Sequence, residues 1–128
     1  MRKVNKDLAS IIIVNYNNAQ YLSKSINSVL KQKYKYKEII VVDDKSNDNS
    51  IKILKRYEGK IKVIKNKKKT KTGSYNQINS YYLGFLKSTG KIIFFLDSDD
   101  YFSNRKISEV MNFFTKKRKP VFYLICQS

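Results

Sequence analysis

Four runs of apolar, largely β-branched residues alternate along the chain with segments whose apolar residues recur at helical spacing. The runs are Leu8–Asn15, Glu38–Val42, Ile61–Ile64 and Lys91–Leu96. Continuous apolar runs of this length are typical of strands that are buried on both faces, as in parallel sheets. The order of strand, helix and strand places the helices over the two faces of such a sheet. The sequence therefore predicts an α/β fold with a Rossmann-like, mostly parallel sheet flanked by helices.

Apolar residues at helical spacing predict four helices, which contain Leu22–Leu30, Ile51–Tyr57, Ile78–Leu86 and the segment from Asn104 to about Lys117. Asparagine and aspartate side chains often accept hydrogen bonds from the first turn of a helix. We therefore expect Asn17 or Asn18 to cap the first helix. Asn47 or Asp48 is expected to cap the second. A last apolar run, Val121–Cys126, follows Pro120.

Composition limits the kind of protein that this can be. A length of 128 residues favours one domain, and 41% hydrophobic with 13% aromatic residues excludes a disordered tail. The chain has no histidine and one cysteine, Cys126, which excludes Cys/His zinc sites and a histidine base and favours a reducing compartment. The amino-terminal apolar stretch Ile11–Val14 is too short for a signal peptide or a membrane span. We therefore expect a cytoplasmic protein.

Polar or aromatic residues follow the ends of three predicted strands, at Asn15–Asn17, Asp43–Asp44 and Asp97–Asp100. In open parallel sheets the ligand crevice lies beyond the carboxyl ends of the strands. The fold itself requires none of these residue types at these places. Their common location predicts one shared site.

Three carboxylates fall within four positions at Asp97, Asp99 and Asp100, directly after a buried run. Adjacent acids repel one another, and hard divalent cations such as Mg²⁺ or Mn²⁺ take oxygen ligands while leaving room for substrate phosphates. A solvated turn is the ordinary alternative for an isolated D-x-D pattern. The other polar groups at the same sheet edge favour the metal site.

These residues suit a nucleoside diphosphate. Tyr16 can stack on a flat heterocycle, although it can also simply cover the sheet edge. Asp43 or Asp44 can accept the imide N–H of uracil, or can instead stabilise a helix N-terminus. Asp97 and Asp99, with a metal, can hold ribose hydroxyls and a diphosphate.

Several sequence blocks keep their order and spacing between Ala9 and Val110, and together they resemble the amino-terminal, nucleotide-binding half of a family 2 glycosyltransferase with the A-type fold. The blocks are Ser10–Asn17, Tyr21–Leu22, Ser25–Ile26, Ser28–Leu30, Gln32, Tyr34, Glu38–Asp48, Gly90–Ile93 and Leu96–Asp100.

The resemblance implies nucleotide-binding roles for Val14, Tyr16, Asp44, Asp97 and Ser98, and a metal-ligand role for Asp99. Val14 and Tyr16 would line the base pocket, and Asp44 would meet the uracil imide. Asp97 would lie near the ribose, and Asp99 would hold Mn²⁺ or Mg²⁺. Members of this family typically transfer a sugar, with inversion, from a nucleotide donor such as a uridine diphosphate sugar to a saccharide or lipid-linked acceptor in polysaccharide biosynthesis.

The chain departs from the family pattern at three points. Lys45 stands where the family often has glycine, and Tyr81-Tyr82 stand where it often has an Arg-Asn pair. Glu109 is the only acid after Asp100, and its helical setting argues for a surface role, so we assign no catalytic base. We expect residues 1–128 to form one nucleotide-sugar-binding domain, apparently truncated, that lacks the acceptor-binding part of the fold.

The net charge of +17 leaves other readings open. Lys31–Lys37 interleaves lysines with Tyr34 and Tyr36, which could form a nucleic-acid surface, but the acidic cluster argues against a basic groove and no nucleic acid is expected. Lysine-rich faces could also support peripheral membrane association. A phosphoacceptor receiver domain is disfavoured because its acidic pair would follow the first strand.

Overall fold

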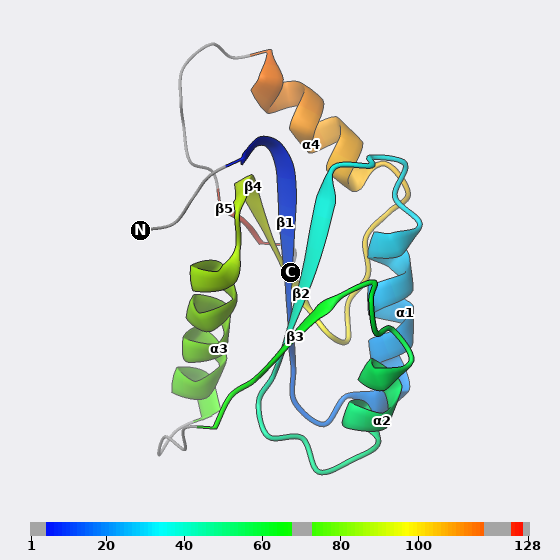
Figure 1. The fold of residues 1–128 in the computed structure, drawn as a ribbon, viewed down its shortest axis with the longest axis vertical. Helices are drawn as coiled ribbons and strands as arrows, with labels where there is room; N and C mark the ends of the chain where they lie inside the picture. The colour runs from blue at the N-terminus through cyan, green and yellow to red at the C-terminus, as the bar shows by residue number, and fades with distance from the viewer. Residues whose placement is uncertain (1–4, 68–72, 117–123, 127–128) are drawn as a thin grey trace.

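The computed structural model describes residues 5–67, 73–116 and 124–126. Strands and helices alternate along the chain as β1(Asn5–Asn15), α1(Ala19–Leu30), β2(Lys37–Asp43), α2(Ser50–Lys55), β3(Lys62–Lys65), α3(Gly73–Lys87), β4(Gly90–Asp97), α4(Lys106–Thr115) and β5(Leu124–Cys126). The five strands form one parallel sheet in the order β3-β2-β1-β4-β5 (Figure 1). The predicted α/β fold is therefore confirmed.

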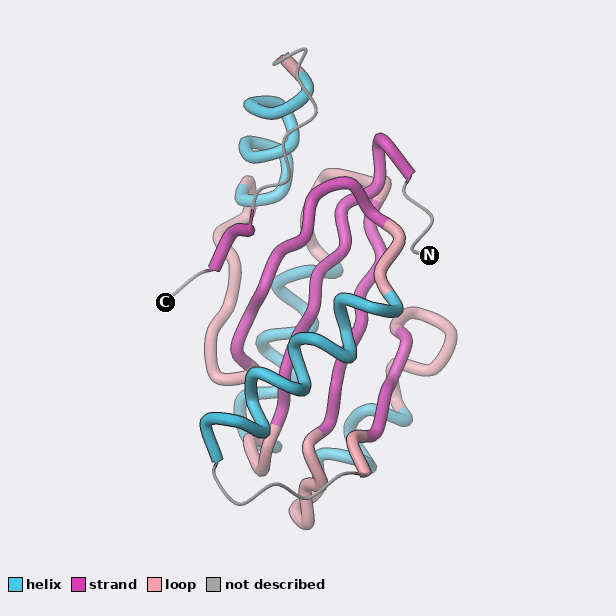
Figure 2. Tube along the Cα trace, turned by 90° about the vertical axis from the view of Figure 1, so that its left-hand side faces the viewer, coloured by secondary structure: helices cyan, strands magenta, loops and turns pink. Residues whose placement is uncertain are grey.

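Helices cover both faces of the sheet (Figure 2), and successive residues of β1 show how. Ile11 and Ile13 point into a core cluster that includes residues of α1, α2 and α4. Ile12 and Val14 point into a second cluster, against α3. Because neighbouring strand residues face opposite sides, a strand that is covered on both faces must be apolar throughout. This requirement explains the uninterrupted Ile-Ile-Ile-Val run.

Helix α3 packs very closely on its face of the sheet. A Cβ atom at Gly84 would overlap Ile12 Cγ2 and lie 3.2 Å from Val42 Cγ2. The missing side chain therefore lets the helix backbone approach the two central strands. This contact fixes the height of α3 above the sheet.

The strand predictions are correct to within a few residues. β1 begins three residues before the predicted start, and β4 includes Gly90, which lies too close to Leu8 O and Ser10 to carry a side chain. α2 ends at Lys55, before Tyr57, and α4 begins at Lys106 rather than Asn104. Residues 121–123 of the last apolar run lie outside the described residues. Among the described helices, none is both long and apolar enough to cross a bilayer.

The predicted caps are wrong in part. Asn18 occupies the N-cap position of α1 but makes no capping hydrogen bond with its side chain, and the N-cap position of α2 is Asn49. Asp48 serves both helices instead: its carboxylate accepts the backbone N–H of Ala19 at 3.0 Å and that of Ser50 at 2.9 Å. Burial raises the pKa of Asp48, but these hydrogen bonds outweigh it and lower the pKa overall. One carboxylate thus ties the two helix starts together.

Candidate functional site

A pocket of about 720 Å³ opens where the carboxyl ends of β1, β2 and β4 meet the start of α3. It is lined by Val14, Tyr16, Asn18, Asp44, Lys45, Asn47, Asn76, Gln77, Asp97, Ser98 and Asp99. All six residues to which the family resemblance gave nucleotide- or metal-binding roles are in this set, whereas Asp43 and Asp100 are not. The structure therefore brings together side chains that lie up to 85 positions apart, from Val14 to Asp99.

The turn after β1 presents Tyr16 to solvent, with 59% of its surface exposed. Next to it, Asn17 has a φ of 50°, a left-handed conformation that asparagine tolerates better than most residues. The Asn17 N–H donates to Ser46 Oγ at 2.9 Å, and Asn17 Oδ1 accepts the Asn47 N–H at 2.8 Å. These bonds lock the β1 turn to the β2 turn, which holds the aromatic ring over the pocket.

The two acids after β2 have different surroundings. Asp43 is 2% exposed, and its carboxylate accepts Asn15 Nδ2 at 2.9 Å and the Ser46 N–H at 3.0 Å. Asp44 lines the pocket, and its Oδ1 accepts a hydrogen bond from the buried Asn66 Nδ2 at 3.1 Å. Of the two carboxylates, Asp43 braces the turn and Asp44 faces the pocket.

Lys45 continues this turn with a φ of 58°. A side chain in the left-handed region is strained by its own Cβ, which is why glycine usually occupies such positions. The lysine lines the pocket beside Asp44. The position where the sequence departs from a glycine pattern is thus one whose backbone favours glycine.

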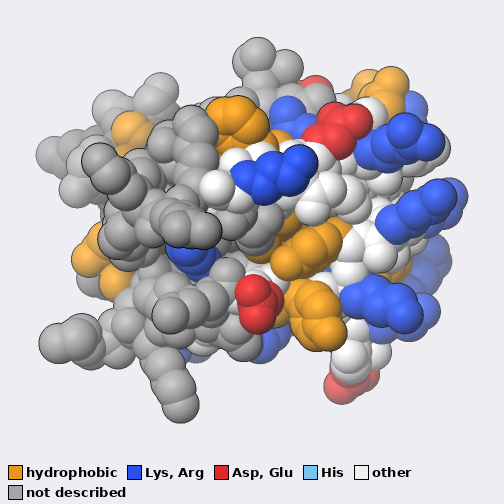
Figure 3. Space-filling model, turned by 90° about the horizontal axis from the view of Figure 1, so that it is seen from above, with side chains coloured by type: hydrophobic (Ala, Val, Ile, Leu, Met, Phe, Trp, Pro, Cys, Tyr) orange, Lys and Arg blue, Asp and Glu red, His pale blue; other side chains and the backbone are white. Residues whose placement is uncertain are grey.

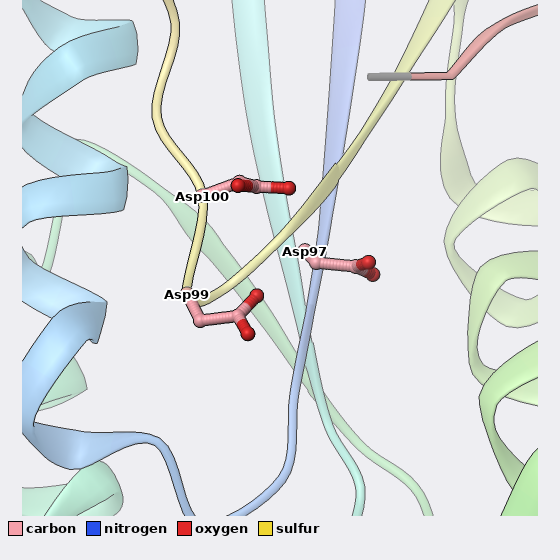
Figure 4. Close-up of side chains that lie close together, drawn as sticks. All are labelled: Asp97, Asp99 and Asp100. Atoms are coloured by element: carbon pink, nitrogen blue, oxygen red, sulfur yellow. The ribbon is translucent and has the colours of Figure 1, made fainter. Parts of the chain in front are cut away.

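Asp97, Asp99 and Asp100 lie together at the end of β4 (Figure 4). One carboxylate oxygen from each falls within 4.8 Å of the others. Asp99 is exposed, whereas Asp97 and Asp100 are half-buried. Within the described residues the one ion pair joins Lys62 to Glu38, so no lysine neutralises this cluster there. Three acids at this spacing can share a divalent cation.

Helix α1 holds the loop that carries these acids. Asn18 Nδ2 donates to Ser98 Oγ at 3.0 Å. Farther along the helix, Ser28 Oγ accepts the Phe102 N–H at 3.0 Å. The buried Gln32 accepts the Ile107 N–H at 3.1 Å and donates to Ser103 O at 2.6 Å. The loop is therefore fixed at its start, middle and end by α1 and the residues that flank this helix.

Sequence reasoning did not assign five of the pocket residues: Asn18, Lys45, Asn47, Asn76 and Gln77. Asn18 and Asn47 lie beside assigned residues, and their strand-end location was the available signal. Asn76 and Gln77 lie in the first half of α3, whose position over the pocket depends on how closely that helix packs on the sheet. No local sequence pattern predicts that these helical residues will line the pocket.

The lysine-rich segment before β2 lies at the opposite end of the sheet from the pocket, and hydrogen bonds tie part of it to the fold. Tyr34 donates its hydroxyl to Asp7 O, and its ring packs edge-on against Tyr36. Lys37 donates to Gln32 O and Tyr34 O, and burial lowers its pKa. In the view of that end (Figure 3), several described lysines and arginines lie along one edge, and others lie beside acidic, hydrophobic and other side chains.

Comparison with protein families gives a match over residues 10–127 to the model described as Glycosyl transferase family 2. Among curated proteins, the chain is 36% identical over 118 residues to the Escherichia coli UDP-Glc:alpha-D-GlcNAc-diphosphoundecaprenol beta-1,3-glucosyltransferase WfgD, covering 91% of this chain and 44% of that one. It is 34% identical over 108 residues to the Staphylococcus aureus poly(ribitol-phosphate) beta-N-acetylglucosaminyltransferase TarP, covering 81% of this chain and 32% of that one.

A solved structure shows the same similarity. The crystal structure of S. aureus TarS 1-349 in complex with UDP-GlcNAc superposes with a TM-score of 0.71 at 26% identity, over 84% of this chain and 31% of that one. The chain thus spans less than half the length of each of these three proteins.

Proposed function

The chain belongs to glycosyl transferase family 2, and from that premise we propose that its pocket binds a nucleotide-sugar donor, specifically a uridine diphosphate sugar. One observation carries the proposal: side chains from three strand ends, chosen from sequence for base, ribose and diphosphate contacts, all line one pocket. The similarity to TarS, which was solved with UDP-GlcNAc, supports the choice of uridine. A 720 Å³ pocket lies within the usual range for small-molecule sites.

The residues predicted from sequence have separate roles in the proposed complex. Tyr16 stacks on the base above Val14, and Asp44 accepts the imide N–H that uracil offers and cytosine lacks. The Asn66 amide, which donates to Asp44, supports this role because it fixes the orientation of the carboxylate. Asp97 and Ser98 lie on the ribose side.

The acid cluster fits a divalent cation, Mn²⁺ or Mg²⁺, with Asp99 as its main ligand. The support comes from the donor set: three carboxylate oxygens within 4.8 Å of one another, with no ion pair to a described residue, and with Asp99 exposed. Oxygen-only donors of this kind suit hard cations. Such a cation would neutralise the charge on the departing diphosphate.

We propose that the complete protein transfers the sugar with inversion to a saccharide or lipid-linked acceptor in the cytoplasm. The names of WfgD and TarP, one for a diphosphoundecaprenol-linked and one for a poly(ribitol-phosphate) acceptor, support this range of acceptors. Glu109 lies exposed on α4 and does not line the pocket, and we assign it no catalytic role. The excess of lysine supports peripheral attachment to anionic membranes, which liposome sedimentation at varied anionic lipid content would test.

Calorimetry tests donor binding. We expect UDP to bind in the presence of Mn²⁺ or Mg²⁺, and binding to disappear with chelator and in the Asp99→Ala variant. Glu109→Ala removes one exposed acid from outside the pocket and should leave binding unchanged. The proposal is wrong if no nucleoside diphosphate gives metal-dependent heat. Binding of nucleic acid that weakens steeply with salt and ignores Asp99→Ala would instead favour the basic-module alternative.

A further inference from the structure

The carboxylate of Asp97 is held by two side chains of α3. Its Oδ1 accepts a hydrogen bond from Gln77 Nε2 at 3.1 Å and another from the Tyr81 hydroxyl. Gln77 and Tyr81 are four positions apart, so they lie on the same face of the helix, one turn from each other. Figure 4 shows the Asp97 carboxylate pointing toward this helix. Asp97 therefore differs from Asp99, for which the described part of the chain supplies no such donor.

Tyr81 is well placed to fix that carboxylate. Its ring packs at 4.7 Å, centroid to centroid, against Phe95 of β4, two residues before Asp97. It belongs to the apolar cluster of α3 and the sheet, where Gly84 brings the helix close. Packing thus restricts the movement of the Tyr81 ring and of the helix that carries it, so the position of the hydroxyl is well defined.

Repulsion among the three carboxylates explains why the hydrogen bonds to Asp97 matter. Three carboxylates within 4.8 Å repel one another, and a bound cation would attract all three. Neutral donors such as a phenol and an amide stabilise the ionised Asp97 without adding a competing positive charge. They also leave its second oxygen available as an acceptor.

We propose that Tyr81 and Gln77 are positioning residues that keep Asp97 on the α3 side of the pocket as an acceptor for the nucleotide, which leaves the cation to Asp99 and Asp100. The inference rests on the proposed function of the pocket. Tyr81 is one of the two positions where this chain departs from the Arg-Asn pattern. The inference gives Tyr81 a role that acts through Asp97 and not through direct contact with the nucleotide-sugar donor.

The test compares Tyr81→Phe with Tyr82→Phe. Each loses one hydroxyl from α3, but Tyr82 is 56% exposed and does not line the pocket. Calorimetry measures UDP binding at saturating Mn²⁺ and, separately, binding of Mn²⁺ alone. For Tyr81→Phe we expect UDP affinity to fall about tenfold, the effect of losing one hydrogen bond to a charged group. Mn²⁺ affinity without nucleotide should change by less than about twofold, and Tyr82→Phe should match the wild type.

Gln77→Leu provides a second measurement because Gln77 is exposed and its loss should not disturb folding. It should weaken UDP binding in the same direction, again without weakening Mn²⁺ binding. Unchanged UDP affinity in Tyr81→Phe or in Gln77→Leu would overturn the inference. So would an equal fall in UDP and Mn²⁺ affinities, which would place these residues in support of the cation site. Absence of metal-dependent UDP binding in the wild type would instead defeat the proposed function.

Discussion

Replacing Lys45 by glycine should stabilise the fold, although it removes a side chain. Lys45 has a φ of 58°, where the Cβ of an L-residue crowds its own carbonyl. That crowding costs about 1–2 kcal/mol. Glycine avoids it but loses about 0.5–1 kcal/mol more backbone freedom on folding. The free energy of unfolding should therefore rise by about 0.5–1 kcal/mol.

Urea denaturation followed by circular dichroism measures this change, and the midpoint should rise while the slope with denaturant stays constant. A parallel thermal melt should show an increase of roughly 2–4 °C for a chain of this size. Lys35→Gly is the matched control because it removes the same charge from an exposed loop residue that is not among the positive-φ residues. There glycine adds only freedom to the unfolded chain, so Lys35→Gly should be destabilising by several tenths of a kcal/mol.

Opposite signs for the two variants are the essential result. If Lys45→Gly and Lys35→Gly both destabilise, the turn after β2 does not strain its lysine, and the backbone argument fails. If both stabilise equally, relief of charge repulsion in a chain of net charge +17 explains the gain instead.

Two further substitutions probe the sheet. Gly84→Ala should be destabilising by about 1–3 kcal/mol in urea titrations despite the higher helix propensity of alanine, because its methyl group would overlap Ile12 Cγ2; an unchanged midpoint would mean that α3 can lift from the sheet. Burial raises the pKa of Glu38, but hydrogen bonds from Ser10, Thr89 and Lys62 outweigh it and hold the pKa below 4.5. The stability advantage of wild type over Glu38→Gln should thus be full above about pH 4.5 and shrink as the pH falls below it; a constant advantage down to pH 3 would contradict this.

The sequence predicted the sheet well because strands that are covered on both faces must be apolar at every position, and this leaves an unmistakable local pattern. Helix ends were less predictable. The carboxylate of Asp48 serves two helices that meet only in the folded structure, and the amide of Asn18 reaches Ser98, 80 positions away. Such side chains have several possible partners, and only tertiary structure selects among them.

The site residues also divide into those that the sequence could predict and those that it could not. Tyr16, Asp44 and Asp99 follow strand ends, and a parallel sheet brings strand ends together by construction, so they could be found without coordinates. Gln77 lies inside a helix, where nothing in the neighbouring residues indicates a pocket. Its contact with Asp97 arises from the close approach of α3, which depends on Gly84, about two turns farther along the same helix.

The hydrogen bonds along α1 have a consequence for the rigidity of the pocket. The Ala19 end of the helix is joined through Asp48 to the loop after β2, and Gln32, just past the other end, is hydrogen-bonded to the segment beyond the acids. The loops after β2 and β4, which form opposing walls of the pocket, are thus both held by α1 and the residues that flank it. Leu22 and Ile26 on the apolar face of α1 are fully buried in the core. Packing of this face therefore helps to keep the pocket walls at a fixed distance, although no α1 side chain lines the pocket.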